Sequence, residues 1–109
     1  MNLLRGEVWW VDLNPTKGSE INKKRPCVIL SADILNQRRR TVVVVPLSTA
    51  PTVRPPLTVA VSSGGRTAVA VIDQIRATTK ERFGNRIGTL SASEMEAIEE
   101  SLRQILGMC

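Results

Sequence analysis

Arg25 is the side chain whose neighbours best suit it for chemistry. It precedes Pro26, which favours an extended backbone, and it stands where a polar segment enters an apolar run at residues 27–31. A guanidinium group held at such a junction presents planar donors that match phosphate oxygens in pairs. The alternative is an ordinary surface arginine, paired for example with Glu20. Position alone leaves both roles open.

Two hydroxyl residues, Ser48 and Thr49, follow the longest apolar run of the chain, residues 41–47. Strand ends that lead into loops often carry functional hydroxyls, and equally often hydroxyls that only hydrogen-bond a turn. Because this run is apolar on both faces, strand alternation does not say which hydroxyl faces a site. Both are candidates to hold an oxygen of a substrate.

A polar break, Asp73 to Arg76, follows another apolar run. Asp73 could act as a carboxylate in a cleft and Arg76 as a phosphate contact, while an ion pair at a strand end is the structural alternative. Trp9 and Trp10 point to opposite faces of one predicted strand, and at least one belongs in the core. The other could stack on a nucleic-acid base or fill a subunit interface, and packing is favoured.

Composition narrows the possible chemistry. The 109 residues include no histidine, which excludes Ser-His-Asp and Cys-His catalysis and histidine-containing zinc sites. Cys27 and Cys109 form neither a metal-binding pair nor a C-x-x-C motif, so we expect no metal and no other cofactor. Residues 1–88 carry 14 basic and 6 acidic side chains, and residues 89–109 carry one basic and four acidic. A basic body suggests a polyanionic partner, with a merely solvated surface as the alternative.

The elements that must position these residues are mostly strands. β-branched and aromatic runs predict strands at 6–13, 27–31, 41–47, 57–61, 67–78 (one bent strand or two) and 86–90. Helical turns are expected at 33–36 and 80–84, and loops at 14–24 and 48–56. Ser91 and Glu94 form a capping box, and apolar residues recur at helical spacing after it, which predicts a C-terminal helix.

We therefore expect a single domain over residues 1–109. Its fold class is mainly β with a C-terminal helix, as a mostly antiparallel sheet or small barrel of five to seven strands. No apolar run approaches the ~20 residues of a membrane-spanning helix, and the start lacks a signal-peptide pattern. The chain is expected to be cytoplasmic, with no membrane partner.

The order of the motifs resembles that of the MazF/PemK family of toxin endoribonucleases. The resemblance covers nearly the whole chain and rests on RGEVWWVDLNP at 5–15, GSE at 18–20, RPCVIL at 25–30, TVVVVPLS at 41–48, DQIR at 73–76 and RIGTLS at 86–91. It implies an SH3-like small β-barrel of the MazF/CcdB kind and a homodimer. It also implies cleavage of single-stranded RNA at short motifs without a metal, and inhibition by a cognate MazE-like antitoxin.

The resemblance also implies roles for particular residues. The catalytic arginine of the R-P motif corresponds to Arg25, and the catalytic threonine at the end of the long strand corresponds to Ser48, with Thr49 beside it. Some members use an arginine two positions before the aspartate; here Val71 stands there, which weakens the case for Asp73. Glu20 and Asp73 are the candidates for a general base. The expected RNA-binding residues are Lys17, Glu20, Asn22, Lys23, Lys24, Arg76 and Arg86.

The absence of histidine is compatible with RNA cleavage, because RNA supplies its own nucleophile, the ribose 2′-OH. The resemblance implies a 2′,3′-cyclic phosphate and a 5′-hydroxyl as products. Arg25 would stabilise the growing charge and Ser48 would hold the scissile phosphate. Two other functions stay open on the sequence: a non-catalytic, gyrase-poisoning toxin of the CcdB kind, and a plain RNA-binding barrel.

Overall fold

The computed structural model describes residues 2–13, 23–49 and 52–108. Within these ranges the strands are β1 (Glu7–Asp12), β2 (Lys24–Ile29), β3 (Thr41–Ser48), β4 (Thr58–Ser63), β5 (Arg66–Val71), β6 (Arg76–Thr79) and β7 (Phe83–Thr89). The α-helices are α1 (Asp33–Arg38) and α2 (Ala92–Ile105), and two single 3₁₀ turns are η1 (Ile72–Gln74) and η2 (Lys80–Arg82).

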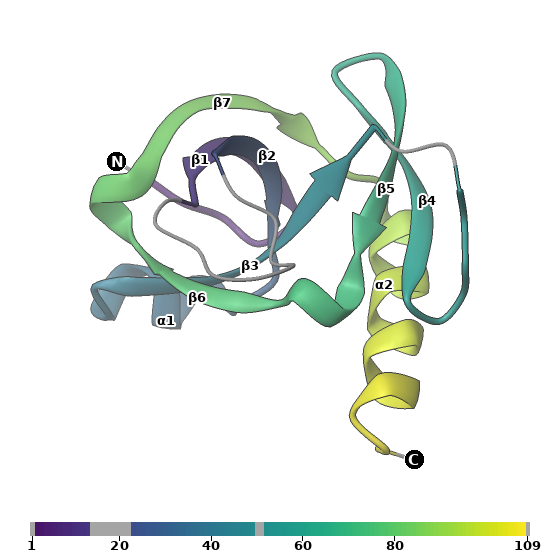
Figure 1. The fold of residues 1–109 in the computed structure, drawn as a ribbon. Coiled ribbons are helices and arrows are strands. Elements are labelled where there is room, and N and C mark those ends of the chain that lie inside the picture. The colour runs from purple at the N-terminus through teal and green to yellow at the C-terminus, as the bar shows by residue number, and fades with distance from the viewer. Residues whose placement is uncertain (1, 14–22, 50–51, 109) are drawn as a thin grey trace.

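One curved antiparallel sheet carries the fold (Figure 1). The strand order is β4-β5-β3-β2-β1-β7, and β6 pairs with the first half of β3. β3 is shared between two neighbours on one side, since residues 41–44 pair with β6 whereas Leu47 and Ser48 pair with β5. The expected mainly β fold with a C-terminal helix is confirmed, in the form of a half-barrel.

Two apolar cores lie on opposite faces of β2 and β3. Val28 and Val45, paired across the two strands, face the first core, which α2 covers. Cys27 and Val44 point from the other face into the second core, between β1, β2, β3 and β7. Successive side chains of a strand alternate between faces, so a strand between two cores must be apolar at every position. This explains the unbroken apolar run at residues 42–47, which follows the exposed Thr41.

The capping box predicted for the C-terminal helix is confirmed. The Ser91 hydroxyl accepts a hydrogen bond from the Glu94 N–H at 3.2 Å, and Glu94 Oε1 accepts one from the Ser91 N–H at 2.9 Å. Glu94 Oε2 accepts a further bond from the Ser62 N–H at 2.6 Å, which ties the start of α2 to β4. Burial raises the pKa of Glu94, but the hydrogen bonds outweigh it and the net pKa is lowered.

Several predicted boundaries are corrected. For residues 67–78 the sequence left one bent strand or two open, and the structure has two, β5 and β6, with η1 between them. The last strand, β7, begins at Phe83 rather than at residue 86, because Phe83 pairs with Val11 and fills the second core. The predicted turn at 80–84 is accordingly shortened to η2.

Cys27 is a free thiol. Neither α-helix of the described ranges is long and apolar enough to cross a membrane.

Candidate active site

β2 and β3 bring Arg25 and Ser48 to one place. Their antiparallel register pairs Cys27 with Pro46, and two residues further along it leads to Arg25 and Ser48. Both side chains are half-buried, and both line a cleft of about 480 Å³. The two candidates that sequence reasoning placed in separate motifs are therefore neighbours across two paired strands.

The β2–β5 cleft, as we call it, lies between the end of β2, the end of β3 and the β4–β5 hairpin. Its cations are Lys24, Arg25 and Arg66, and its hydroxyl groups come from Ser48, Thr49, Ser63 and Thr67. No carboxylate is found among the described residues that line it. A positive cleft with several hydroxyl donors is suited to a phosphodiester backbone.

The Arg25 guanidinium makes neither a hydrogen bond nor an ion pair with the rest of the described chain. It is thus open to a ligand from the side of the cleft. Glu20, the partner considered from the sequence, lies outside the described residues.

Cys27 follows Arg25 by two residues in β2. Its thiol takes no part in chemistry at neutral pH. Burial raises the pKa of Cys27 to about 12, and the positive charge of Arg76 opposes this only in part. A protonated, buried thiol is a poor nucleophile, so Cys27 acts as a core residue.

Three of the other predicted residues, Asp73, Arg76 and Arg86, do not line the β2–β5 cleft. Asp73 is exposed in η1, and Arg76 is half-buried at the start of β6. Arg86 on β7 forms an ion pair with Glu7, Nε to Oε2 at 2.8 Å, and donates to the Thr89 hydroxyl at 2.8 Å. These bonds give Arg86 a structural role within the sheet.

Of the predicted RNA-binding residues between positions 17 and 24, the structure describes only Lys23 and Lys24, the first residue of β2. Lys17, Glu20 and Asn22 lie outside the described residues. Lys23 is exposed and adopts a left-handed backbone, with φ of 68°, and its carbonyl accepts the Leu13 N–H at 3.0 Å.

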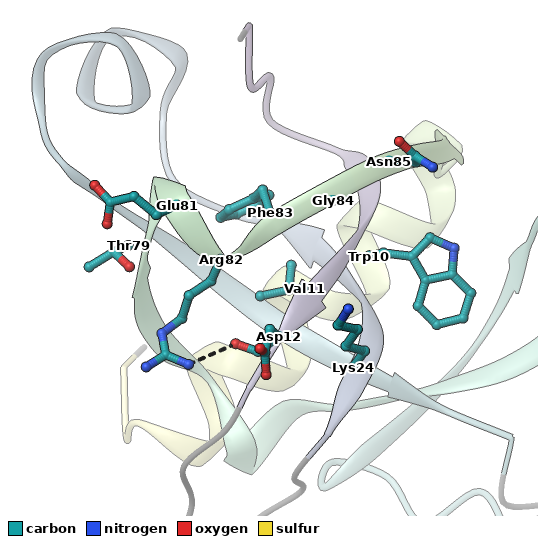
Figure 2. Close-up of a pocket in the computed structure, with 10 residues that line it drawn as sticks. All are labelled: Trp10, Val11, Asp12, Lys24, Thr79, Glu81, Arg82, Phe83, Gly84 and Asn85. Atoms are coloured by element: carbon teal, nitrogen blue, oxygen red, sulfur yellow. Dashed lines mark hydrogen bonds between the residues drawn. The ribbon is translucent and has the colours of Figure 1, made fainter.

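A second and larger cleft, of about 930 Å³ (Figure 2), shares Trp10 and Lys24 with the first and therefore lies beside it. This β1–β7 cleft is lined by Trp10, Val11, Asp12, Lys24, Thr79, Glu81, Arg82, Phe83, Gly84 and Asn85. Arg82 donates to the Asp12 carbonyl at 3.2 Å. The carboxylates of Asp12 and Glu81 balance the charges of Lys24 and Arg82. The β1–β7 cleft is the larger of the two, but the β2–β5 cleft has the charge that suits a phosphate.

Sequence reasoning missed Arg66 and misjudged Trp10. Arg66 follows Gly64 and Gly65, whose φ values of 58° and 78° close a two-residue hairpin between β4 and β5. The Gly-Gly pair, which is typical of a hairpin turn, is the sequence signal that could have pointed to Arg66. The sequence favours packing for both tryptophans. Trp9 packs edge-on against Phe83, but Trp10 is 44% exposed and lines both clefts.

Comparison with known proteins gives concordant matches. A family model described as PemK-like, MazF-like toxin of type II toxin–antitoxin system matches residues 4–106. Endoribonuclease MazF9 of Mycobacterium tuberculosis is 35% identical over 108 residues, covering 91% of this chain and 92% of its own length. The endoribonuclease toxin MazF of Escherichia coli K12 is 32% identical over 103 residues, covering 94% and 92%.

Solved structures agree with these matches. An endoribonuclease from a mycobacterial species, in complex with its cognate antitoxin, has a TM-score of 0.81 at 28% identity, covering 97% of this chain and 96% of its own. MazF from Deinococcus radiodurans has a TM-score of 0.89, covering 99% of each chain. At 21% identity, the latter supports the fold alone.

Proposed function

This chain belongs to the PemK-like, MazF-like toxins of type II toxin–antitoxin systems and is an endoribonuclease, and from that premise we propose that it cuts single-stranded RNA in the β2–β5 cleft. The observation that carries the proposal is the meeting of Arg25 and Ser48 in a cleft whose described lining is cationic. Cleavage at short sequence motifs in mRNA would stop translation and growth. This reading replaces the gyrase-poisoning and purely RNA-binding alternatives.

The proposed reaction is an internal transesterification. The ribose 2′-oxygen forms a bond to the adjacent phosphorus while the bond from phosphorus to the 5′-oxygen of the next nucleotide breaks. The 2′-OH gives up its proton, and the departing 5′-oxygen receives one. The products are a 2′,3′-cyclic phosphate and a 5′-hydroxyl, and the reaction needs no external nucleophile.

Arg25 and Ser48 suit the two tasks that this reaction sets. The Arg25 guanidinium would pair with the non-bridging phosphate oxygens, where negative charge grows in the transition state. The Ser48 hydroxyl would donate to the same phosphate and hold it in line for attack, with the Thr49 hydroxyl next to it. Because the pKa of an arginine is ordinarily above ~12, Arg25 serves as a charge stabiliser and not as the base.

For the general base we retain Glu20 over Asp73. Asp73 is exposed in η1 and is not among the residues that line the β2–β5 cleft. Glu20 precedes β2 closely in the chain and is one of the predicted RNA-binding residues, with Lys17 and Asn22. Lys23 and Lys24 would contact flanking phosphates, and Arg76 would add positive charge from β6.

We also propose that two copies of the chain form a homodimer and that an acidic, MazE-like antitoxin segment occupies the basic cleft. Support for the antitoxin comes from the mycobacterial endoribonuclease, which was solved in complex with its cognate antitoxin. Light scattering on the purified chain should give the mass of two copies. A small acidic protein encoded beside it should bind it and block RNA cleavage.

The decisive experiment incubates the purified protein with long single-stranded RNA in EDTA and maps the new ends. We expect cuts at a short motif that leave 5′-hydroxyl ends, which a polynucleotide kinase labels without prior phosphatase treatment. Arg25→Ala should abolish cleavage, whereas Arg38→Ala, exposed on α1 and lining neither cleft, should cut like the parent. Cleavage by Arg25→Ala at the parental rate would refute the site, and intact RNA with inhibited gyrase would refute the function.

A further inference from the structure

Trp10 occupies the boundary between the two clefts. It lines both, and Lys24 is the other described residue that does so. Its side chain is 44% exposed, and Figure 2 shows the indole projecting at one end of the β1–β7 cleft, beyond Val11 and Lys24. A large planar apolar surface is thus presented to solvent beside a cationic cleft.

The base of this indole is firmly held. Trp10 pairs with Pro26 across β1 and β2, which places it next to Arg25 along the partner strand. On the other side, β7 passes close by: a Cβ added at Gly84 would lie 3.5 Å from the Trp10 Cβ and 3.6 Å from its carbonyl oxygen. The backbone around Trp10 is therefore enclosed by two strands, while the ring itself stays accessible.

We propose that Trp10 stacks on the base of a nucleotide adjacent to the scissile phosphate and so helps to select and hold the cleavage site. The inference rests on the proposed function, because the phosphate is taken to lie at Arg25 and Ser48. Aromatic side chains beside a cationic groove are the usual platform for unpaired bases. The β1–β7 cleft, whose charges balance, does not attract a phosphate, but Thr79 and Asn85 offer hydrogen-bonding groups to the edge of a base.

The first test measures binding of a short RNA that spans a mapped cleavage site and carries 2′-deoxyribose at the scissile position, so that it cannot be cut. Trp10→Ala should weaken binding by roughly 5- to 100-fold, and Trp10→Phe, which keeps a stacking surface, should stay within about threefold of the parent. Leu106→Ala, which truncates a similarly exposed side chain at the end of α2, is the matched control and should bind like the parent. Equal binding by the parent and Trp10→Ala would overturn the proposal.

A second test separates stacking from a structural role. In the same RNA, each base flanking the scissile phosphate is replaced in turn by an abasic residue. The parent should lose affinity strongly at one position, and Trp10→Ala should lose little more there, because the contact is already missing. Full additivity of the two losses at every position would overturn the proposal.

Fluorescence gives an independent check should Trp10→Ala fold poorly. The emission that the parent has in excess of Trp10→Phe belongs to Trp10 and should be quenched on RNA binding. Emission that stays unquenched on RNA binding would overturn stacking. So would a Trp10→Ala protein that changes from dimer to monomer but keeps its RNA affinity, and this result would assign Trp10 to an interface between copies. If the parent cuts no RNA at all, the proposed function itself has failed, an outcome distinct from all of these.

Discussion

Ser48 tests how far a single methyl group matters for the proposed chemistry. Serine and threonine donate the same hydrogen bond, but threonine is branched at Cβ and therefore more restricted in χ1. Ser48→Ala should reduce the cleavage rate about 10²- to 10³-fold, as expected for removing one donor to a transition-state oxygen. Ser48→Thr should cut at least as fast as the parent. Single-turnover rates on one mapped RNA site check both.

Thr49→Ala is the matched control for this prediction, because Thr49 lines the same cleft but is more exposed than Ser48. It should retain most of the activity. If Thr49→Ala is inactive and Ser48→Ala is not, the catalytic hydroxyl belongs to Thr49 and the assignment along β3 is wrong by one position.

Cys27 should resist thiol reagents in the folded protein. Burial raises its pKa to about 12, so at pH 8 almost all of the thiol is protonated, and the side chain is fully enclosed in the second core. In a Cys109→Ser variant, a disulfide reagent such as DTNB should label Cys27 only as fast as the protein opens. Adding urea should then accelerate labelling in step with unfolding. Rapid labelling without denaturant would contradict the burial of Cys27.

At the scale of elements, periodicity predicted the strands and the helix whose residues show a local pattern. It failed where contacts with residues far away in the sequence determine the boundary of an element. The capping box and apolar spacing predicted α2, and the apolar run at residues 41–47 predicted β3. The early start of β7 was missed because Phe83 stands among polar residues and a glycine, and only its place in the second core makes it part of a strand. Local sequence carries no record of such a contact.

The candidate site divides in the same way. Arg25 and Ser48 were predicted because each stands at the end of an apolar run, which is a local signal. Arg66 and Trp10 enter the cleft through the β4–β5 hairpin and through the pairing of β1 with β2. Their participation depends on which strands are neighbours and on how the sheet curves, and spacing along the chain reveals neither.

The capping box makes a prediction about stability. Ser91→Ala should lower the free energy of unfolding by about 1 kcal/mol, because it leaves the Glu94 N–H without its side-chain acceptor. Glu94→Gln should also destabilise the protein, and its effect should depend on pH. The folded-state pKa of Glu94 is lowered, so its contribution is complete above the unfolded pKa and is lost as pH falls through the folded value.

Urea unfolding at pH 7 and at about pH 3 measures this dependence. The difference between the parent and Glu94→Gln should shrink at the lower pH. Glu96→Gln, a change of the same charge on an exposed position of α2, is the control and should have little effect at either pH. A difference for Glu94→Gln that stays constant between the two pH values would contradict the ionic role of its carboxylate.

At the scale of the whole molecule, positive and negative charge are separated. The acidic residues of α2 lie on the helix that covers the first core, and Glu99 is paired there with Arg5 at 2.6 Å. The described lining of the β2–β5 cleft contributes three cations and no carboxylate. The described lining of this cleft therefore has no carboxylate of its own to offset its cations, which favours the approach of a polyanion.

RNA affinity should therefore depend strongly on salt, and Arg66 should carry a measurable share of that dependence. For single strands, each phosphate neutralised by the protein contributes about −0.7 to the slope of log K against log salt concentration. Arg66→Ala should thus make the slope shallower by about 0.7, and it should weaken binding in low salt more than in high salt. Arg38→Ala removes the same charge from α1, outside both clefts, and should leave the slope unchanged. The measurement is a titration of uncleavable RNA at several salt concentrations. Equal slopes for Arg66→Ala and the parent would mean that Arg66 contacts no phosphate. The RNA strand would then leave Arg25 and Ser48 in a direction away from the β4–β5 hairpin.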